Sequence, residues 1–158
     1  MIALDLQPFG IVSNVGFQRF CNVLEPRYKL PSDRHISLKL IPDIYGCVKE
    51  KLKEELSYIK HIAFTTDIWS SSVGSNLLLS LTGHWINENF VRKKGVLSAS
   101  SFVGRHTANA IQTELENTLA AWNIEKERVV TVLRDNAANV TAGLTAAGIG
   151  HQGCFIHT

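Results

Sequence analysis

Residues His61–Trp69, with the sequence HIAFTTDIW, decide how the rest of the chain is interpreted. Ile62, Ala63 and Phe64 are apolar, two threonines follow them, and then comes a single acid at Asp67. Because β-branched and aromatic residues favour strands over helices, this stretch predicts a buried strand. That strand delivers one carboxylate at its end.

A second apolar run has the same form. Val129–Leu133 leads to Asp135 in the sequence VVTVLRDNAAN. Two strands that each end in an aspartate can bring two carboxylates together. Such carboxylates repel each other unless a cation lies between them, and hard oxygen ligands suit Mg²⁺ or Mn²⁺. We therefore predict that Asp67 and Asp135 share a divalent metal ion. In the alternative interpretation, Asp67 caps a loop and Asp135 caps the following helix.

The composition is that of a folded, water-soluble chain. It has 158 residues, of which 45% are hydrophobic and 19% are charged, and its net charge is +2. That charge is far from the strong basic footprint of many DNA-binding domains. Three scattered cysteines favour a reducing compartment. We find no secretory signal and no run of about 20 apolar residues, so we expect no membrane partner and a location in the cytosol or nucleus.

Residues 1–60 predict a helical N-terminal segment. Phe17, Phe20 and Leu24 are spaced for one face of a helix. Ser32 or Asp33 can cap a short helix that Pro42 is expected to interrupt. A longer amphipathic helix follows, in which the apolar residues recur every three or four positions: Tyr45, Val48, Leu52, Leu56 and Ile59.

Residues 61–158 predict a second domain with a mixed sheet. Strand patterns and helix patterns occur in the order strand, strand, strand, helix, strand, helix, which is an α/β arrangement. The expected strands are 61–67, 77–86, 90–102, 129–133 and, at the end, 153–156. The expected helices begin after Thr107 and at Asn139.

Five stretches, in this order, resemble the hAT-type transposases and the zinc-finger BED-containing proteins derived from them. These are TTDIWSS (65–71), LTGHWI (81–86), HTANAI (106–111), DNAANV (135–140) and CFIHT (154–158). The N-terminal stretches DLQPF, GFQRF, EPRYKLPS and IPDIYG also look like the segment before that family's catalytic core. The resemblance implies an incomplete ribonuclease-H-like core in residues 61–158.

The resemblance also implies roles for individual residues. Asp67 and Asp135 correspond to the first two catalytic acids, which hold Mg²⁺ or Mn²⁺ in that family. Cys154 and His157 match a Cys-x-x-His pair near its active site, where they are candidates for DNA contact. The family's third acid, a glutamate on a later helix, is not among the 158 residues. We therefore expect no catalysis from this chain by itself. We also expect no small-molecule cofactor.

The functional expectation is a fragment of a DNA-transposase-derived protein that associates with DNA in the nucleus. One alternative is a domesticated, non-catalytic nuclear protein that binds DNA and regulates transcription. Another is a fragment without an independent role, whose unfinished sheet edge promotes self-association. An upstream Cys/His finger would favour the first of these alternatives.

Further candidates for DNA contact are one aromatic residue and one basic triplet. Trp69 lies near Asp67 and can stack on an unpaired base, although packing is the commoner role of a tryptophan. Arg92, Lys93 and Lys94 can bind phosphates or simply form a solvated hairpin surface. The pattern His151-x-x-Cys154-x-x-His157 offers three zinc ligands, but a structural zinc site needs four and no fourth is evident nearby.

Overall fold

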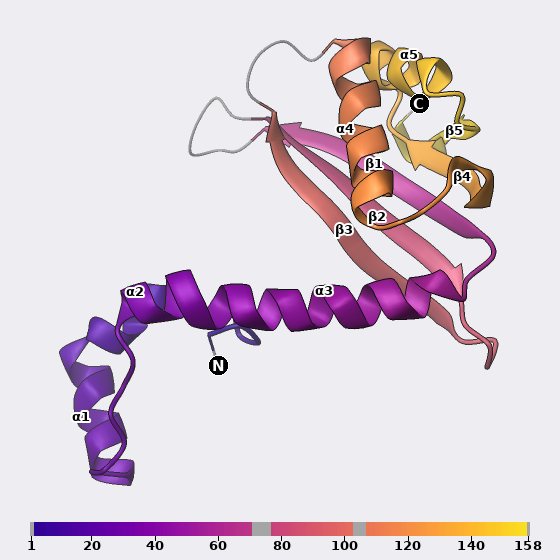
Figure 1. Ribbon diagram of the computed structural model, residues 1–158. Helices are drawn as coiled ribbons and strands as arrows, with labels where there is room; N and C mark the ends of the chain where they lie inside the picture. The colour runs from indigo at the N-terminus through magenta and orange to yellow at the C-terminus, as the bar shows by residue number, and fades with distance from the viewer. Residues whose placement is uncertain (1, 71–76, 103–106, 158) are drawn as a thin grey trace. The chain divides into compact units, whose positions relative to one another are not determined.

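The computed structural model describes residues 2–70, 77–102 and 107–157. The chain divides into two compact units, Met1–Leu52 and Lys53–Thr158. Figure 1 shows helices in the first unit, and a sheet accompanied by helices in the second. No helix among the described residues is long and apolar enough to cross a membrane.

The first unit is helical, as the sequence predicts. Ser32 begins the continuous helical stretch, and its side-chain oxygen accepts a hydrogen bond from the His35 backbone N–H at 3.1 Å. Val12 and Ile36 are its buried apolar residues. The elements are a 3-10 helix Phe9–Ser13, α1 Val15–Leu24, α2 Asp33–His35, a π-helix Ile36–Leu40 and α3 Ile41–Ser57, which continues into the second unit.

The prediction that Pro42 interrupts this helical stretch is wrong. Pro42 is the second residue of α3, and the helical backbone runs through it without a break. A proline has no N–H to donate and its ring crowds the carbonyl four residues earlier. The turns directly before α3 are a π-helix, Ile36–Leu40, and the wider winding of a π-helix accommodates such a residue.

The second unit is built on a five-stranded mixed sheet with the strand order β3-β2-β1-β4-β5. β1 is antiparallel to β2 and parallel to β4, and β4 is parallel to β5. The α/β class and the strand–helix order are therefore confirmed. The strands are β1 Ile62–Ser70, β2 Leu77–Ile86, β3 Arg92–Phe102, β4 Val129–Arg134 and β5 His151–Gly153.

The last strand was misplaced by sequence reasoning. It was expected at 153–156, but β5 ends at Gly153 and a 3-10 helix, Phe155–His157, follows. The Cys154 N–H donates to the Arg134 carbonyl, at the last residue of β4. Beyond that point the neighbouring strand offers no further pairing. Phe155 and Ile156, which the prediction placed in the strand, are exposed.

The end of α3 belongs to the second compact unit. Residues 53–60 belong to the second unit, where Leu56 is buried. Arg128, just before β4, explains this attachment. Its Nε donates to the Ile59 carbonyl at 3.0 Å, and its Nη2 also bonds the Leu56 carbonyl. A guanidinium that binds the last carbonyls of a helix caps its C-terminal end, so the end of α3 is fixed to the sheet domain.

Helices α4 (Ala108–Ala121) and α5 (Ala138–Ala146) lie side by side against the sheet (Figure 1). Thr107 caps α4 as predicted, because its side-chain oxygen accepts from the Ala110 N–H. Apolar side chains from both helices, from one face of the sheet and from the end of α3 form the core, and the largest fully buried ones are Phe64, Leu56, Ile62, Ile111, Leu144, Val132 and Val140.

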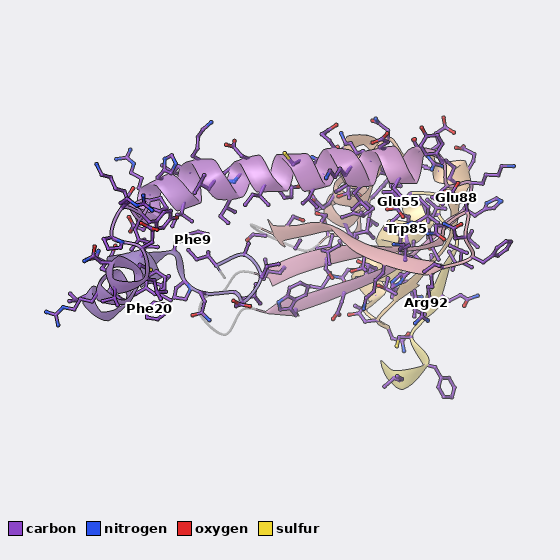
Figure 2. The ribbon with its side chains drawn as sticks, turned by 90° about the horizontal axis from the view of Figure 1, so that it is seen from below. Phe9, Phe20, Glu55, Trp85, Glu88 and Arg92 are labelled. Atoms are coloured by element: carbon purple, nitrogen blue, oxygen red, sulfur yellow. The ribbon has the colours of Figure 1, made fainter. Side chains whose placement is uncertain are left out.

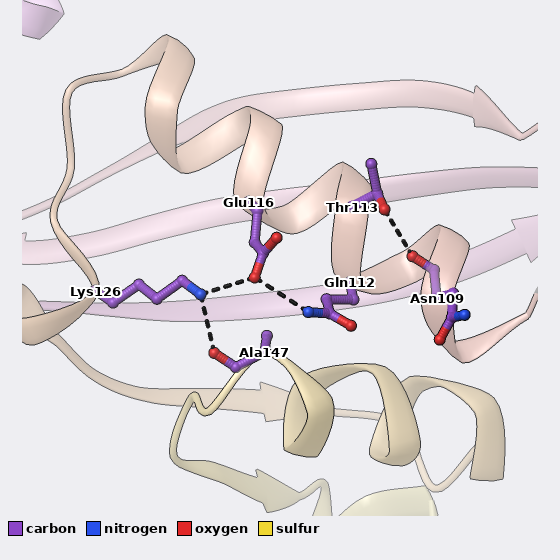
Figure 3. Close-up of polar contacts among 6 residues, drawn as sticks. All are labelled: Asn109, Gln112, Thr113, Glu116, Lys126 and Ala147. Atoms are coloured by element: carbon purple, nitrogen blue, oxygen red, sulfur yellow. Dashed lines mark hydrogen bonds and ion pairs between the residues drawn. The ribbon is translucent and has the colours of Figure 1, made fainter.

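A polar link joins the two helices at their surface (Figure 3). Lys126 Nζ lies 2.7 Å from Glu116 Oε1 on α4, and it donates to the Ala147 carbonyl at the end of α5 at 3.1 Å. Gln112 donates to the same Glu116 oxygen. The hydrogen bonds from Lys126 and Gln112 lower the pKa of Glu116 below its ordinary value of 4.5.

This shift predicts a pH dependence of stability. Because the folded-state pKa of Glu116 lies below the unfolded value, its contribution is present above pH 4.5 and is lost as the pH falls through the folded-state pKa. Thermal melting of the wild type and Glu116→Gln should therefore differ at pH 7 and converge in acid. An equal difference at both pH values would contradict the assignment, and Glu114→Gln, on the same helix, is the control.

Gly143 allows α5 to approach α4 closely. A Cβ atom at this position would lie 2.9 Å from the Ala108 carbonyl oxygen and 2.9 Å from Ile111 Cγ2. Overpacking of this kind typically costs about 1–3 kcal/mol. The position therefore requires the smallest side chain, although glycine is a poor helix former.

We expect Gly143→Ala to lower the free energy of unfolding in urea by about 1–2 kcal/mol, after allowing for the better helix propensity of alanine. Gly46→Ala in α3 is the matched control, because a Cβ atom added there would meet no neighbouring atom within 4 Å. It should be neutral or stabilising. A stabilising Gly143→Ala would show that the contact between α4 and α5 is looser than these distances indicate.

Candidate functional site

The register of β1 and β4 places Asp67 and Asp135 at the same end of two adjacent strands. Thr65 pairs with Leu133 in the parallel ladder. Each aspartate lies two residues further toward the carboxyl end of its own chain segment. Asp67 is within β1, and Asp135 directly follows β4. The sheet thus brings together two acids that are far apart in sequence.

Asp67 points away from the core. Residues of β1 alternate between buried and more exposed positions: Phe64 and Thr66 are buried, whereas Thr65 is half-buried and Asp67 is exposed. Side chains two residues apart on a strand share a face. Among the described residues, no group donates a hydrogen bond to the Asp67 carboxylate. This carboxylate is therefore accessible to a ligand from solvent.

Asp135 has a structural partner. Its Oδ1 accepts a hydrogen bond from the Ala137 N–H at 3.2 Å, just before α5 begins. The bond stabilises the turn before α5, but it does not cap the helix itself, because the N-cap residue of α5 is Ala137 and no side chain caps it. A carboxylate has two oxygens and about four acceptor positions, so one bond to the backbone leaves room for a metal ion.

Arg134 is turned away from the carboxylates. Its Nη1 donates to the Asp135 main-chain carbonyl at 2.8 Å, and its Nε donates to His151 Nδ1 at 3.2 Å. His151 Nε2 lies 3.0 Å from the Thr145 hydroxyl. Both ring nitrogens of His151 are therefore engaged within the protein, which removes one of the three candidate zinc ligands.

Cys154 follows β5 at the position next to Asp135, at the same end of the sheet as the two acids. Arg134 pairs with Gly153 in the parallel ladder of β4 and β5, so the next residues along are Asp135 and Cys154. The thiol is half-buried and free of a disulfide. The side chain of His157 lies outside the described part of the structure. The sheet thus brings Cys154 to the same end as the aspartates, whereas the predicted pair with His157 stays a prediction.

Trp69 lies two residues after Asp67 on the same strand, and it is 40% exposed. Its cross-strand partner is Leu78. An aromatic ring on the face that carries Asp67 is placed to contact a ligand at this end of the sheet.

The basic triplet lies elsewhere. Asp67 pairs with Ser80 on β2, whereas Arg92 pairs with Ile86, six positions further along that strand. At about 3.3 Å per residue, this is roughly 20 Å. A pocket of about 900 Å³ lies at the triplet's end and is lined by His84, Trp85 and Lys93 among others, but by neither aspartate. The structure therefore separates Arg92, Lys93 and Lys94 from the acids.

Sequence reasoning missed the close approach of Asn136, just after Asp135, to Gly153 on β5. A Cβ atom on Gly153 would lie 2.5 Å from Asn136 Oδ1. The glycine therefore lets the Asn136 side chain pass close to β5. No local pattern predicts this close approach, because Gly153 on β5 and Asn136 in the segment between β4 and α5 are far apart in sequence.

The comparisons with known proteins identify the family of this chain. Residues 65–146 match the model of the ZBED1 RNase-like domain, a stretch that includes both aspartates. The chain belongs to this family. It is a hAT-type, transposase-derived protein, and its mixed sheet is the ribonuclease-H-like core expected from the sequence.

Three relatives show the range of similar proteins. Zinc finger BED domain-containing protein 4 of Homo sapiens is 34% identical over 100% of this chain and 14% of its own length. Zinc finger BED domain-containing protein 6 of Homo sapiens is 28% identical over 99% of this chain and 17% of its own length. An AC transposase of Zea mays is 30% identical over 89% of this chain, again 17% of its own length.

The geometry predicts different structural roles for the two acids. In the presence of a chelator, Asp135→Ala should lower the free energy of unfolding by about 0.5–1.5 kcal/mol, because the Ala137 N–H loses its acceptor. Asp135→Asn keeps an acceptor oxygen and should cost less. Asp67→Asn should change the value by less than about 0.5 kcal/mol, as at other surface sites. Urea denaturation measures all three, and a larger loss in Asp67→Asn would contradict this account.

Proposed function

We propose that the second unit is a DNA-associating core that binds a divalent metal ion through Asp67 and Asp135 and does not cleave DNA by itself. The observation that carries this proposal is the parallel register of β1 and β4, which aligns the two acids at one end of the sheet. The relatives, named as BED zinc-finger proteins and a transposase, support DNA as the partner and the nucleus as the location.

The donor set fits Mg²⁺ or Mn²⁺. These ions prefer oxygen ligands, and Mg²⁺ is usually held by one or two carboxylates together with water and substrate phosphates. Asp67 is open to solvent, and Asp135 keeps acceptor positions free beside its bond to Ala137. When bound, such an ion neutralises the negative charge of a nearby phosphate. The two aspartates would hold the ion, and Trp69 would contact a base beside it.

The absence of catalysis is proposed from the number of acids. Within the described ranges, no group of three or more His, Cys, Asp or Glu side chains could hold a metal ion. Two carboxylates can bind one ion weakly, but two-metal phosphoryl transfer needs ligands for both ions. We therefore expect metal-dependent DNA binding by this chain without strand cleavage.

Mn²⁺ tests this proposal, since it broadens the NMR signals of nearby residues. Titration of the 158-residue chain should first broaden the amide signals around residues 67 and 135. Asp67→Asn and Asp135→Asn should each weaken the binding by roughly tenfold or more, because even changes outside the direct ligands cost 10–100-fold at metal sites. The asparagine at residue 135 keeps the turn, so folding is preserved.

Asp43→Asn is the matched control, because Asp43 is an exposed acid on α3. It should leave the titration unchanged. The same variants, mixed with a labelled DNA duplex, should show whether Mn²⁺ increases DNA affinity through the two aspartates. Broadening centred elsewhere, or binding unaffected by both substitutions, would reject the shared-ligand assignment. Cleavage of the duplex would reject the non-catalytic assignment.

A further inference from the structure

The hairpin between β2 and β3 has a rigid tip, residues Asn87–Val91. The Asn87 side-chain oxygen accepts hydrogen bonds from the backbone N–H groups of Asn89 and Val91, at 3.1 and 2.9 Å. The Asn87 N–H donates to the Val91 carbonyl, and its carbonyl accepts from the Phe90 N–H. One asparagine therefore fixes the backbone of the whole turn.

Phe90 is an unexpected residue at this tip. Its φ angle is 57°, in the left-handed region that glycine and asparagine adopt most easily. The side chain is 91% exposed, so it gains almost no burial in return for this strain. Neither the turn geometry nor the packing of the chain accounts for a phenylalanine here. A strained, exposed aromatic residue is a reason to look for a ligand.

The residues that follow Phe90 are cations. Arg92, Lys93 and Lys94 are all exposed, and none forms an ion pair with a described residue. Arg92 and Lys94 share one face of β3 and Lys93 the other. Glu88 is the acid on the tip itself. Figure 2 shows Glu88 and Arg92 at the same end of the second unit as Trp85, whose indole N–H donates to Glu55.

The electrostatic effect of these cations is visible at His84, which pairs with Lys94 across the strands. Burial lowers the pKa of His84 below 6.5, and the charges of Lys94 and Arg92 lower it further. Three exposed cations, Arg92, Lys93 and Lys94, stand against the one acid Glu88 here, so this end of the hairpin carries a net positive charge. That charge complements phosphates, which repeat along a nucleic acid beside flat, apolar bases.

We propose that this tip binds DNA at an unpaired base, with Phe90 stacked on the base and with Arg92, Lys93 and Lys94 on the neighbouring phosphates. The inference rests on the proposed association with DNA, but it assigns a second contact surface, roughly 20 Å along the sheet from Asp67. An exposed phenylalanine is a side chain that proteins insert against unstacked bases, and the adjacent cations supply the affinity for the backbone.

The experiment compares two labelled DNA probes by fluorescence anisotropy with the 158-residue chain. One is a short perfect duplex, and the other is the same duplex with one unpaired thymine. The wild type should bind the bulged probe more tightly. Phe90→Ala should lower the affinity for the bulged probe by about fivefold or more, the lower end of the loss of one stacked base, and should leave the affinity for the duplex unchanged.

Two further variants separate stacking from folding and from charge. Phe90→Gly also removes the ring, but it relieves the left-handed φ, so it should lose the same selectivity while its melting temperature stays equal or rises. Replacing Arg92, Lys93 and Lys94 together by glutamine should weaken binding to both probes and reduce the slope of log affinity against log salt by roughly two to three. Phe90→Trp should keep the preference for the bulged probe.

The outcomes distinguish this inference from the function on which it rests. If the wild type binds neither probe, the proposed DNA association fails and the inference fails with it. If the wild type binds DNA but Phe90→Gly and Phe90→Ala bind both probes as the wild type does, only the Phe90 assignment is overturned. Phe90-dependent binding to anionic phosphatidylserine vesicles, without any effect of Phe90 on DNA, would also overturn it.

Discussion

The parallel pairing of β1 with β4 is the constraint on which the second unit depends. Phe64 and Val132 lie opposite each other in this ladder, and both are almost completely buried. A slip of one residue would move each strand's apolar set to the exposed face. Burial of these two side chains therefore fixes the register. The same register aligns Asp67 with Asp135, so core packing and site geometry have one cause.

Parallel strands also require crossover connections, because a tight turn cannot join them. Here α4 connects β3 to β4, and α5 connects β4 to β5. Gly143 lets these two helices approach each other closely. This packing constrains the junction at which β4 ends and α5 begins. Asp135 occupies that junction and bonds the backbone of Ala137. Its position is set by the helix packing as well as by the sheet.

Sequence patterns predicted what local periodicity encodes. The run of apolar and β-branched residues in 61–67 and the cap residue Thr107 each describe one element, and the structure has those elements. The failures involve residues whose state depends on distant partners. Pro42 lies in a continuous helix because a π-helix precedes it. The segment after Gly153 is not a strand because β4, its neighbour, ends at Arg134.

The candidate site could be predicted only in part, for the same reason. Asp67 and Asp135 can be identified because each follows an apolar run, a pattern that the sequence alone shows. The contact of Arg134 with His151 and the close approach of Gly153 to Asn136 join residues that are distant in sequence, so they have no local signature. The sequence also could not show that the basic triplet lies at the other end of the sheet from the acids, because that separation depends on the register of β2.

Asp135, Asp67 and Phe90 differ in how far the fold itself explains their positions. Asp135 has a structural bond of its own, so its presence can be explained without any ligand. Asp67 is exposed on the strand face opposite the core, and Phe90 is exposed at a backbone angle that disfavours it. Neither side chain contributes burial to the fold. Where local preference and the observed residue disagree without a gain in packing, a contact outside the chain is a physical reason to test. Phe90 meets this condition, because its exposed ring has a left-handed φ angle, whereas exposure is the ordinary state of a charged residue such as Asp67.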